Sequence, residues 1–211
     1  SERAGRLVYQ AAAKQLTPVT LELGGKSPAL VLPDADYDMS AKRIVWGKNL
    51  NSGQTCVAPD FAIVPKKDLG QMLELKRKYV RSFHGDDPLN NGQLTSIINE
   101  QHFDRLVALM DDLEVVHGGR HDRKRLLIEP TIVKGHLDHT LMNEEVFGRI
   151  LPVIGYDNDD EVLEIIRRNP NPLAFYLFTK NRKNEEKWLN AFRFGGGGVN
   201  TALIHVASTS L

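Results

Sequence analysis

The sequence predicts an α/β fold in which helices cover a mostly parallel sheet. Short apolar runs alternate along the chain with segments whose apolar residues recur every three or four positions. This alternation is typical of strands that run parallel and are covered by the helices between them. With 211 residues, the chain can bury such a core without disulfides or a metal.

Each predicted helix has apolar residues on one face. The first ends before Pro18, because proline lacks the N–H that the next turn needs. Asp36 or Asp38 caps the second, which runs to about residue 50. Lysines and arginine at 76–78 are expected on a solvated face of the third. The first helix is expected at 3–16 and the third at 68–83. The later helices are expected at 99–113, 159–168 and 182–193.

The predicted strands are short and apolar, and several are rich in branched or aromatic residues. They are expected at 19–23, 29–33, 61–65, 114–117, 126–133, 151–156 and 173–178, with a last strand-like segment after 198. The glycines at 195–198 follow a predicted helix, so we interpret them as its C-cap turn rather than as a phosphate-binding loop.

Charge and cysteine content narrow the class of protein. The chain has 27 basic and 27 acidic residues, so its surface as a whole attracts neither nucleic acid nor an anionic membrane. A single cysteine forms no intramolecular disulfide, and no secretory signal or membrane-spanning apolar run is visible. We therefore expect a cytoplasmic setting. The chain starts inside a helical pattern and ends in an apolar segment, which suggests a piece of a longer protein.

The one cysteine, Cys56, lies in "NSGQTCVAPD", between a glycine-containing turn and a strand. That position suits an exposed nucleophile. A lone cysteine is more often a small buried apolar residue, so both interpretations remain open. The spacing of histidines and the single cysteine predicts no zinc site, and no phosphate-binding loop motif is present.

Glu22 is the second candidate for chemistry. It closes the strand predicted at 19–23 and precedes two glycines. Functional groups of α/β sheets gather at strand ends, so Glu22 could act as a general base. It could equally cap the loop or pair with Lys26, which more plausibly orders the glycine turn than performs chemistry.

Four stretches in this order resemble the aldehyde dehydrogenase superfamily: "VTLELGGKSPALVLPDAD", "NSGQTCVAPD", "NEEVFG" and "GGGGVN". "SIINEQHFDRL" and "LIHVA" resemble its class 3 and fatty-aldehyde dehydrogenase group. The resemblance covers essentially the whole chain. It implies a catalytic-domain portion at 17–211 that lacks its C-terminal end, and a helical remnant of the dinucleotide-binding domain at 1–16.

The resemblance also implies roles for individual residues. Cys56 matches the catalytic nucleophile and Glu22 the general base. Glu145 matches the glutamate that holds the nicotinamide ribose, and Phe147 the aromatic residue beside that cofactor. Ser1 and Gly5 match the tail of a Gly-Ser-x-x-x-Gly motif, where a helix N-terminus faces the cofactor pyrophosphate. The implied cofactor is NAD or NADP, and the implied partner is a small-molecule aldehyde, with no metal.

The implied reaction oxidises an aldehyde to an acid through a Cys56 thiohemiacetal and thioester, which water then hydrolyses with help from Glu22. A homo-oligomer is expected for the full-length enzyme. A polypeptide limited to these residues should show little dehydrogenase activity, because most of the cofactor domain is missing. Arg149 stands where proline usually follows "FG", which puts the conformation of that loop in question.

Two other functions remain as alternatives. A CoA-acylating aldehyde dehydrogenase would pass the thioester to CoA, but such enzymes generally lack a glutamate at the position of Glu22. A non-catalytic α/β interaction module would use Cys56 as a core residue and Glu22 in a structural ion pair. The reactivity of Cys56 distinguishes this module from an enzyme.

Overall fold

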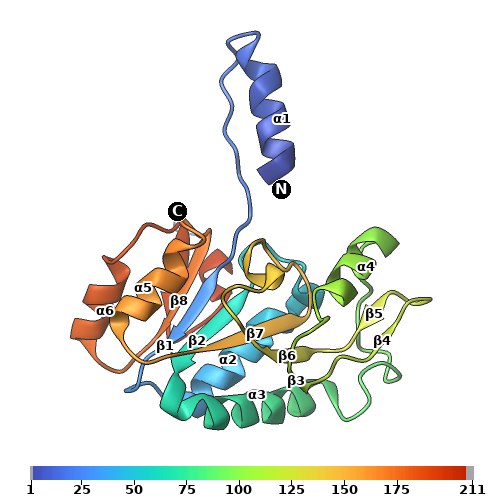
Figure 1. The fold of residues 1–211 in the computed structure, drawn as a ribbon, viewed down its shortest axis with the longest axis vertical. Coiled ribbons are helices and arrows are strands. Elements are labelled where there is room, and N and C mark those ends of the chain that lie inside the picture. Colours follow the sequence, from blue (N-terminus) through green and yellow to red (C-terminus); the bar gives the residue numbers. More distant parts are fainter. Residues whose placement is uncertain (1, 208–211) are drawn as a thin grey trace.

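The computed structural model describes residues 2–207, which fold around one large sheet (Figure 1). Its strand order is β3-β6-β7-β2-β1-β8-β9; β3 pairs antiparallel with β6, and the other pairs are parallel. The strands of this sheet are β1 (Pro28–Val31), β2 (Phe61–Pro65), β3 (Val115–His117), β6 (Thr131–Lys134), β7 (Ile150–Tyr156), β8 (Ala174–Phe178) and β9 (Gly196–Val199). The predicted α/β class with a mostly parallel, covered sheet is therefore confirmed.

Helices cover both faces of this sheet. The helices of the described chain are α1 (Glu2–Ala13), α2 (Tyr37–Asn49), α3 (Leu69–His84), α4 (Glu100–Ala108), α5 (Asp159–Arg167) and α6 (Arg182–Leu189). A separate hairpin pairs β4 (His121–Asp122) with β5 (Leu127–Ile128). None of the described helices is long and apolar enough to cross a membrane.

Each face of the sheet packs into its own apolar cluster, because successive side chains along a strand point to opposite faces. Ala29 and Val31 of β1 belong to the cluster that includes residues of α2 and α3. Leu30, between them, belongs to the cluster that includes residues of α4, α5 and α6. Trp188 of α6 is buried in that second cluster, whereas Trp46 of α2 is 41% exposed.

The helix α1 stands away from the sheet, and an irregular segment over residues 14–27 joins it to β1 (Figure 1). The sequence prediction of a strand at 19–23 is wrong. The alternating pattern is present, but this segment pairs with no strand of the described chain. A β-type pattern needs a partner strand to become a strand, and only the fold supplies that partner.

The glycines at 195–198 also adopt a different structure from the one that was predicted for them. Gly196–Val199 is the edge strand β9, paired with β8, and not a helix C-cap. A Cβ at Gly197 would lie only 1.9 Å from the Phe175 carbonyl oxygen, so this close approach requires glycine. The apolar segment after it forms a short 3₁₀ helix at Ile204–Ala207 instead of a strand.

The basic run 76–78 is not entirely solvated. Lys76 is fully buried, and its ammonium has no hydrogen-bond partner within residues 2–207. Burial lowers the pKa of Lys76 to about 7. The spacing of the apolar residues placed Lys76 on the polar side of α3. In the structure, the face of α3 that packs against α2 and the sheet is wider than those apolar residues indicate, and it includes Lys76.

Candidate functional site

The candidate residues lie in segments that enter parallel strands. Glu22 precedes β1, Cys56 precedes β2, and both Glu145 and Phe147 precede β7. Because β1, β2 and β7 run parallel, the starts of these strands meet at one edge of the sheet. Glu22 therefore does not close a strand as the sequence pattern suggested. The strand order nevertheless brings its segment beside that of Cys56, since β1 and β2 are neighbours.

Cys56 is half-buried and carries a free thiol. It occupies a turn that the Ala58 amide closes by donating to the Thr55 carbonyl at 2.9 Å. The Tyr176 hydroxyl donates to the next carbonyl, that of Val57, at 2.5 Å. Within residues 2–207 the Cys56 backbone N–H donates no hydrogen bond, so it remains available to an oxyanion beside the sulfur.

Glu22 is exposed, between Leu21 and Leu23 in the irregular segment. Both leucines line a cleft below α1, but Glu22 does not. No hydrogen bond or ion pair joins Glu22 to Cys56 among the described residues. The structure thus places the two groups on neighbouring pre-strand segments without a direct contact between them.

A buried ion pair ties these segments together. Lys26 and Asp60 are each at most 3% exposed, and the Lys26 ammonium donates to the Asp60 carboxylate. The same ammonium donates to the carbonyls of Leu141 and Glu144 at 2.9 and 3.0 Å. The other Asp60 oxygen accepts from the Val146 amide at 3.0 Å. One lysine and one aspartate therefore fix the segments before β1, β2 and β7 to one another.

Glu145 lies above this pair, half-buried. Its carboxylate lies close to the backbone of Gly24 and Gly25. A Cβ at Gly24 would lie 2.3 Å from one of its oxygens, so in this position the carboxylate lies directly against the Gly24 backbone. Burial, and then the nearby Asp60 charge, raise the pKa of Glu145 to about 7, although Lys48 and Lys26 partly oppose the shift.

Lys48, in the last turn of α2, completes the charged group. It is 1% exposed, and its nitrogen is 3.7 Å from an Asp60 oxygen without a hydrogen-bond partner among the described residues. Burial lowers the pKa of Lys48 to about 8. Two lysines and two carboxylates thus lie close enough to interact electrostatically at the strand edge.

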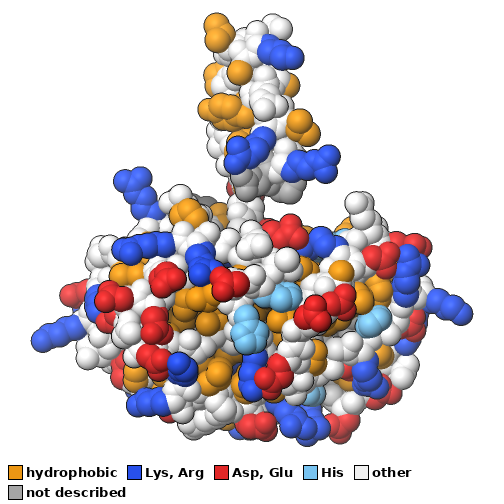
Figure 2. All heavy atoms as spheres, in the orientation of Figure 1, with side chains coloured by type: hydrophobic (Ala, Val, Ile, Leu, Met, Phe, Trp, Pro, Cys, Tyr) orange, Lys and Arg blue, Asp and Glu red, His pale blue; other side chains and the backbone are white. Residues whose placement is uncertain are grey.

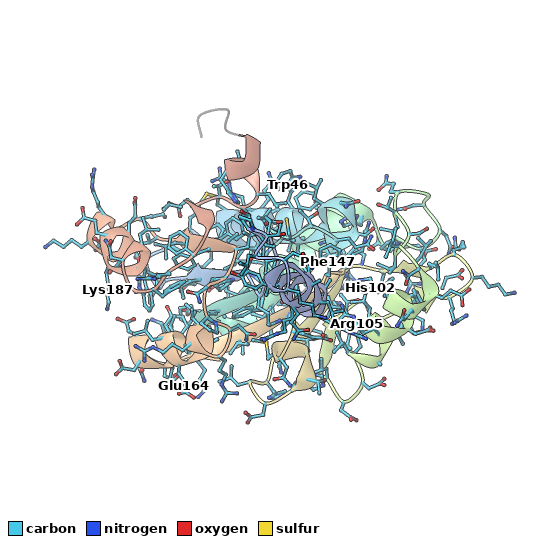
Figure 3. The ribbon with its side chains drawn as sticks, turned by 90° about the horizontal axis from the view of Figure 1, so that it is seen from above. Trp46, His102, Arg105, Phe147, Glu164 and Lys187 are labelled. Atoms are coloured by element: carbon cyan, nitrogen blue, oxygen red, sulfur yellow. The ribbon has the colours of Figure 1, made fainter. Side chains whose placement is uncertain are left out.

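Phe147 is held from outside by α4. Its backbone is in the left-handed region, with φ of 51°. The His102 ring donates from Nε2 to the Phe147 carbonyl at 2.7 Å, and Arg105 donates to the carbonyls of Glu145 and Val146. Figure 3 shows Phe147, His102 and Arg105 grouped on one side of the molecule. These contacts compensate for the unfavourable backbone conformation of Phe147.

Glu145 and Phe147 open into a cleft of about 1370 Å³. Helix α1 forms the opposite wall, where Gly5 allows the helix to approach Leu23. The cleft is rich in cations: its lining includes Arg3, Arg6, Arg105 and Arg168. In Figure 2, α1 rises above the body with basic and apolar side chains on its surface. Ser1 lies outside the described residues.

Sequence reasoning located Cys56, Glu22, Glu145 and Phe147 but missed the residues that hold them. Asp60 is the last residue of the quoted cysteine stretch and Lys48 lies just before that stretch, while His102 and Arg105 come from a stretch that only the resemblance singled out. The helical spacing of the last two, three residues apart, was the available signal. Among residues 2–207, no three His, Cys, Asp or Glu side chains are grouped to hold a metal.

Known proteins resemble this chain in sequence and in fold. The model of the aldehyde dehydrogenase family matches residues 1–210. Aldehyde dehydrogenase family 3 member H1 of Arabidopsis thaliana is 41% identical over 217 aligned residues, which cover 100% of this chain and 45% of the plant protein. The dimeric NADP-preferring aldehyde dehydrogenase of Rattus norvegicus is 40% identical over 212 residues, covering 100% of this chain and 47% of the rat protein.

Among solved structures, Staphylococcus aureus AldH in a substrate-bound state superposes with a TM-score of 0.96 at 38% identity. The match covers 100% of this chain and 47% of that protein. The chain therefore spans about half the length of the relatives it matches.

Proposed function

The chain belongs to the aldehyde dehydrogenase family, and on that premise we propose that it oxidises an aldehyde to a carboxylic acid with NAD or NADP. Cys56 is the nucleophile, Glu22 the general base, and Glu145 and Phe147 contact the cofactor. The observation that supports this assignment most is topological: all four residues lie in segments that enter neighbouring parallel strands at one sheet edge.

The Cys56 sulfur attacks the aldehyde carbon and forms a tetrahedral adduct whose oxygen becomes negative. The uncommitted Cys56 N–H is the donor that this chain offers to the oxyanion. Because Cys56 is half-buried, its side chain is partly shielded from solvent yet still reachable.

Loss of hydride from the adduct leaves a thioester on Cys56. Glu22, exposed on the neighbouring segment, then removes a proton from water, and the resulting hydroxide attacks the thioester carbon. The acid leaves, and the sulfur is released as a thiolate. Water reaches Glu22 directly, so no proton relay through the protein is required.

The residues present fit a nicotinamide dinucleotide. The Glu145 carboxylate, which faces the cleft over Gly24, suits the paired hydroxyls of a ribose, and the arginines of the cleft suit a pyrophosphate. When bound, the nicotinamide supplies the acceptor for the hydride. Lys26, His102 and Arg105 hold the Glu145–Phe147 loop in place for it.

We expect the KM for NAD or NADP to fall as the pH rises through about 7, the pKa of Glu145. A raised carboxyl pKa keeps the acid protonated below that pH, and only the ionised form accepts from both ribose hydroxyls. The measurement is cofactor KM between pH 6 and 9 on the full-length protein. Glu145→Gln should abolish the pH dependence; an unchanged profile in that variant would assign the titration to another group.

The proposal itself is tested without any cofactor, by acylation of the protein with p-nitrophenyl acetate. We expect a stoichiometric burst of nitrophenolate and a mass increase on the tryptic peptide 49–66, which contains Cys56. Cys56→Ser should abolish both, because a serine hydroxyl without an adjacent base is a poor nucleophile at neutral pH. An unmodified peptide 49–66 in the wild type favours the non-catalytic module instead.

The wider properties of the whole protein are also proposals. We propose a cytoplasmic homo-oligomer in which residues 17–211 are a catalytic-domain portion and residues 1–16 are a helical remnant of the dinucleotide-binding domain. The exposed apolar side chains of α1, Leu7, Val8 and Tyr9, support that arrangement, since they belong to neither apolar cluster of the described sheet domain. Residues 1–211 alone should then dehydrogenate aldehydes slowly.

A further inference from the structure

We propose that Arg149 is a positioning residue. It holds the turn formed by residues 51–53, just before Cys56, and thereby connects this cysteine segment to the loop that carries Glu145 and Phe147 (the cofactor loop). This inference rests on the proposed function. Arg149 is 3% exposed at the start of β7 and donates from Nη2 to the Ser52 hydroxyl oxygen at 3.0 Å. Ser52 lies four residues before Cys56.

The turn that contains Ser52 is unfavourable on its own. Asn51, Ser52 and Gly53 have successive φ angles of 50°, 60° and 71°. Residues with a Cβ rarely adopt this region, and two in a row are rarer still. Such a conformation persists only where surrounding contacts hold it.

Arg149 and its neighbour supply contacts of that kind from the cofactor loop. The Ser52 hydroxyl accepts from Arg149 and donates to the Thr95 carbonyl at 2.7 Å, so its hydrogen-bonding capacity is largely used. A Cβ at Gly53 would lie 2.4 Å from the Gly148 carbonyl oxygen, which shows how closely the two backbones pack. Residues 148–149 thus fasten the cysteine segment directly to the loop that carries Phe147.

The charge of Arg149 argues against a purely stabilising role. Its Nε and Nη1 have no hydrogen-bond partner among the described residues, and burial alone lowers its pKa, to about 10. Arg149 also contributes to the low pKa of the half-buried His84, about 4, for which burial is the main cause. A buried guanidinium without an acidic partner destabilises a fold, so a residue kept only for stability would be apolar here.

The test compares Arg149→Met with Arg149→Lys and Ser52→Ala in the full-length protein. Hydrogen exchange of residues 51–58 reports whether the turn is held, and the p-nitrophenyl acetate burst rate reports the position of Cys56. We expect faster exchange and an about tenfold slower burst in Arg149→Met and Ser52→Ala, equivalent to about 1.4 kcal/mol. Arg149→Lys should recover part of the rate, because it keeps one donor and the charge.

Thermal unfolding distinguishes a residue that positions Cys56 from one that only stabilises the fold. Arg149→Met should not lower the unfolding temperature, because it removes an uncompensated buried charge while it slows acylation. The inference is overturned by unchanged exchange at 51–58, by an unchanged burst rate, or by a loss of thermal stability that parallels the slower burst. If Arg149→Met does not fold, the inference is also overturned when Ser52→Ala leaves exchange and burst unaltered. Absence of a burst in the wild type contradicts the proposed function instead, and the exchange result still decides whether Arg149 holds the turn.

Discussion

Glu22→Gln is expected to leave acylation of Cys56 intact and to slow release of the acid by about 100- to 10,000-fold, the usual contribution of a positioned general base. A glutamine cannot take a proton from water, whereas sulfur attack on the carbonyl does not require that carboxylate. The full-length variant should therefore give the full nitrophenolate burst and then stall. Mass spectrometry of peptide 49–66 should show the acyl group persisting on Cys56.

The position of Glu22 sets a strict condition on its role as general base. Its side chain is exposed and forms no hydrogen bond or ion pair with Cys56 among the described residues. A water must therefore bridge the two neighbouring segments for the carboxylate to act. Glu186→Gln is a matched control, because Glu186 is also exposed but lies on α6, outside the strand-entry segments, and has no assigned chemical step. Equal turnover in the Glu22 variant and the wild type would remove Glu22 from the role of base.

Lys26→Met is expected to lower the free energy of unfolding by about 3–5 kcal/mol, as is typical when one partner of a buried ion pair is removed. The Asp60 carboxylate would remain buried, with only the Val146 amide and the more distant Lys48 to stabilise it. The carbonyls of Leu141 and Glu144 would also lose a donor. Urea unfolding followed by far-ultraviolet circular dichroism measures the change.

Lys66→Met provides the control for this substitution. Lys66 forms an ion pair with Asp157 at 2.8 Å, but both side chains are more than half exposed. Removing such a pair changes stability by about 0–1 kcal/mol. If the two lysine variants unfold at the same urea concentration, the Lys26–Asp60 pair does not fasten the strand-entry segments in the way that its geometry indicates.

Local patterns in the sequence were enough to predict most of the sheet domain. β2 begins and ends at the residues that its apolar run predicts, and Asp36 caps α2 through the Met39 amide. The cysteine and glutamate segments, taken together, were sufficient to identify the family, because they are specific as a pair. These features depend on residue order and on short-range physics, which a single sequence contains in full.

What the sequence by itself determined was thus the α/β class and the position of most elements, while its six candidate site residues stay predictions. Only the tertiary structure decided that 19–23 pairs with no strand, that glycines form β9, and that Lys76, Lys26 and Arg149 are buried. Pairing and burial depend on contacts between segments distant in the chain, so local periodicity does not encode them. For the same reason, the Lys26–Asp60 pair and the Arg149–Ser52 contact became visible only once parallel strands brought their starts to one edge.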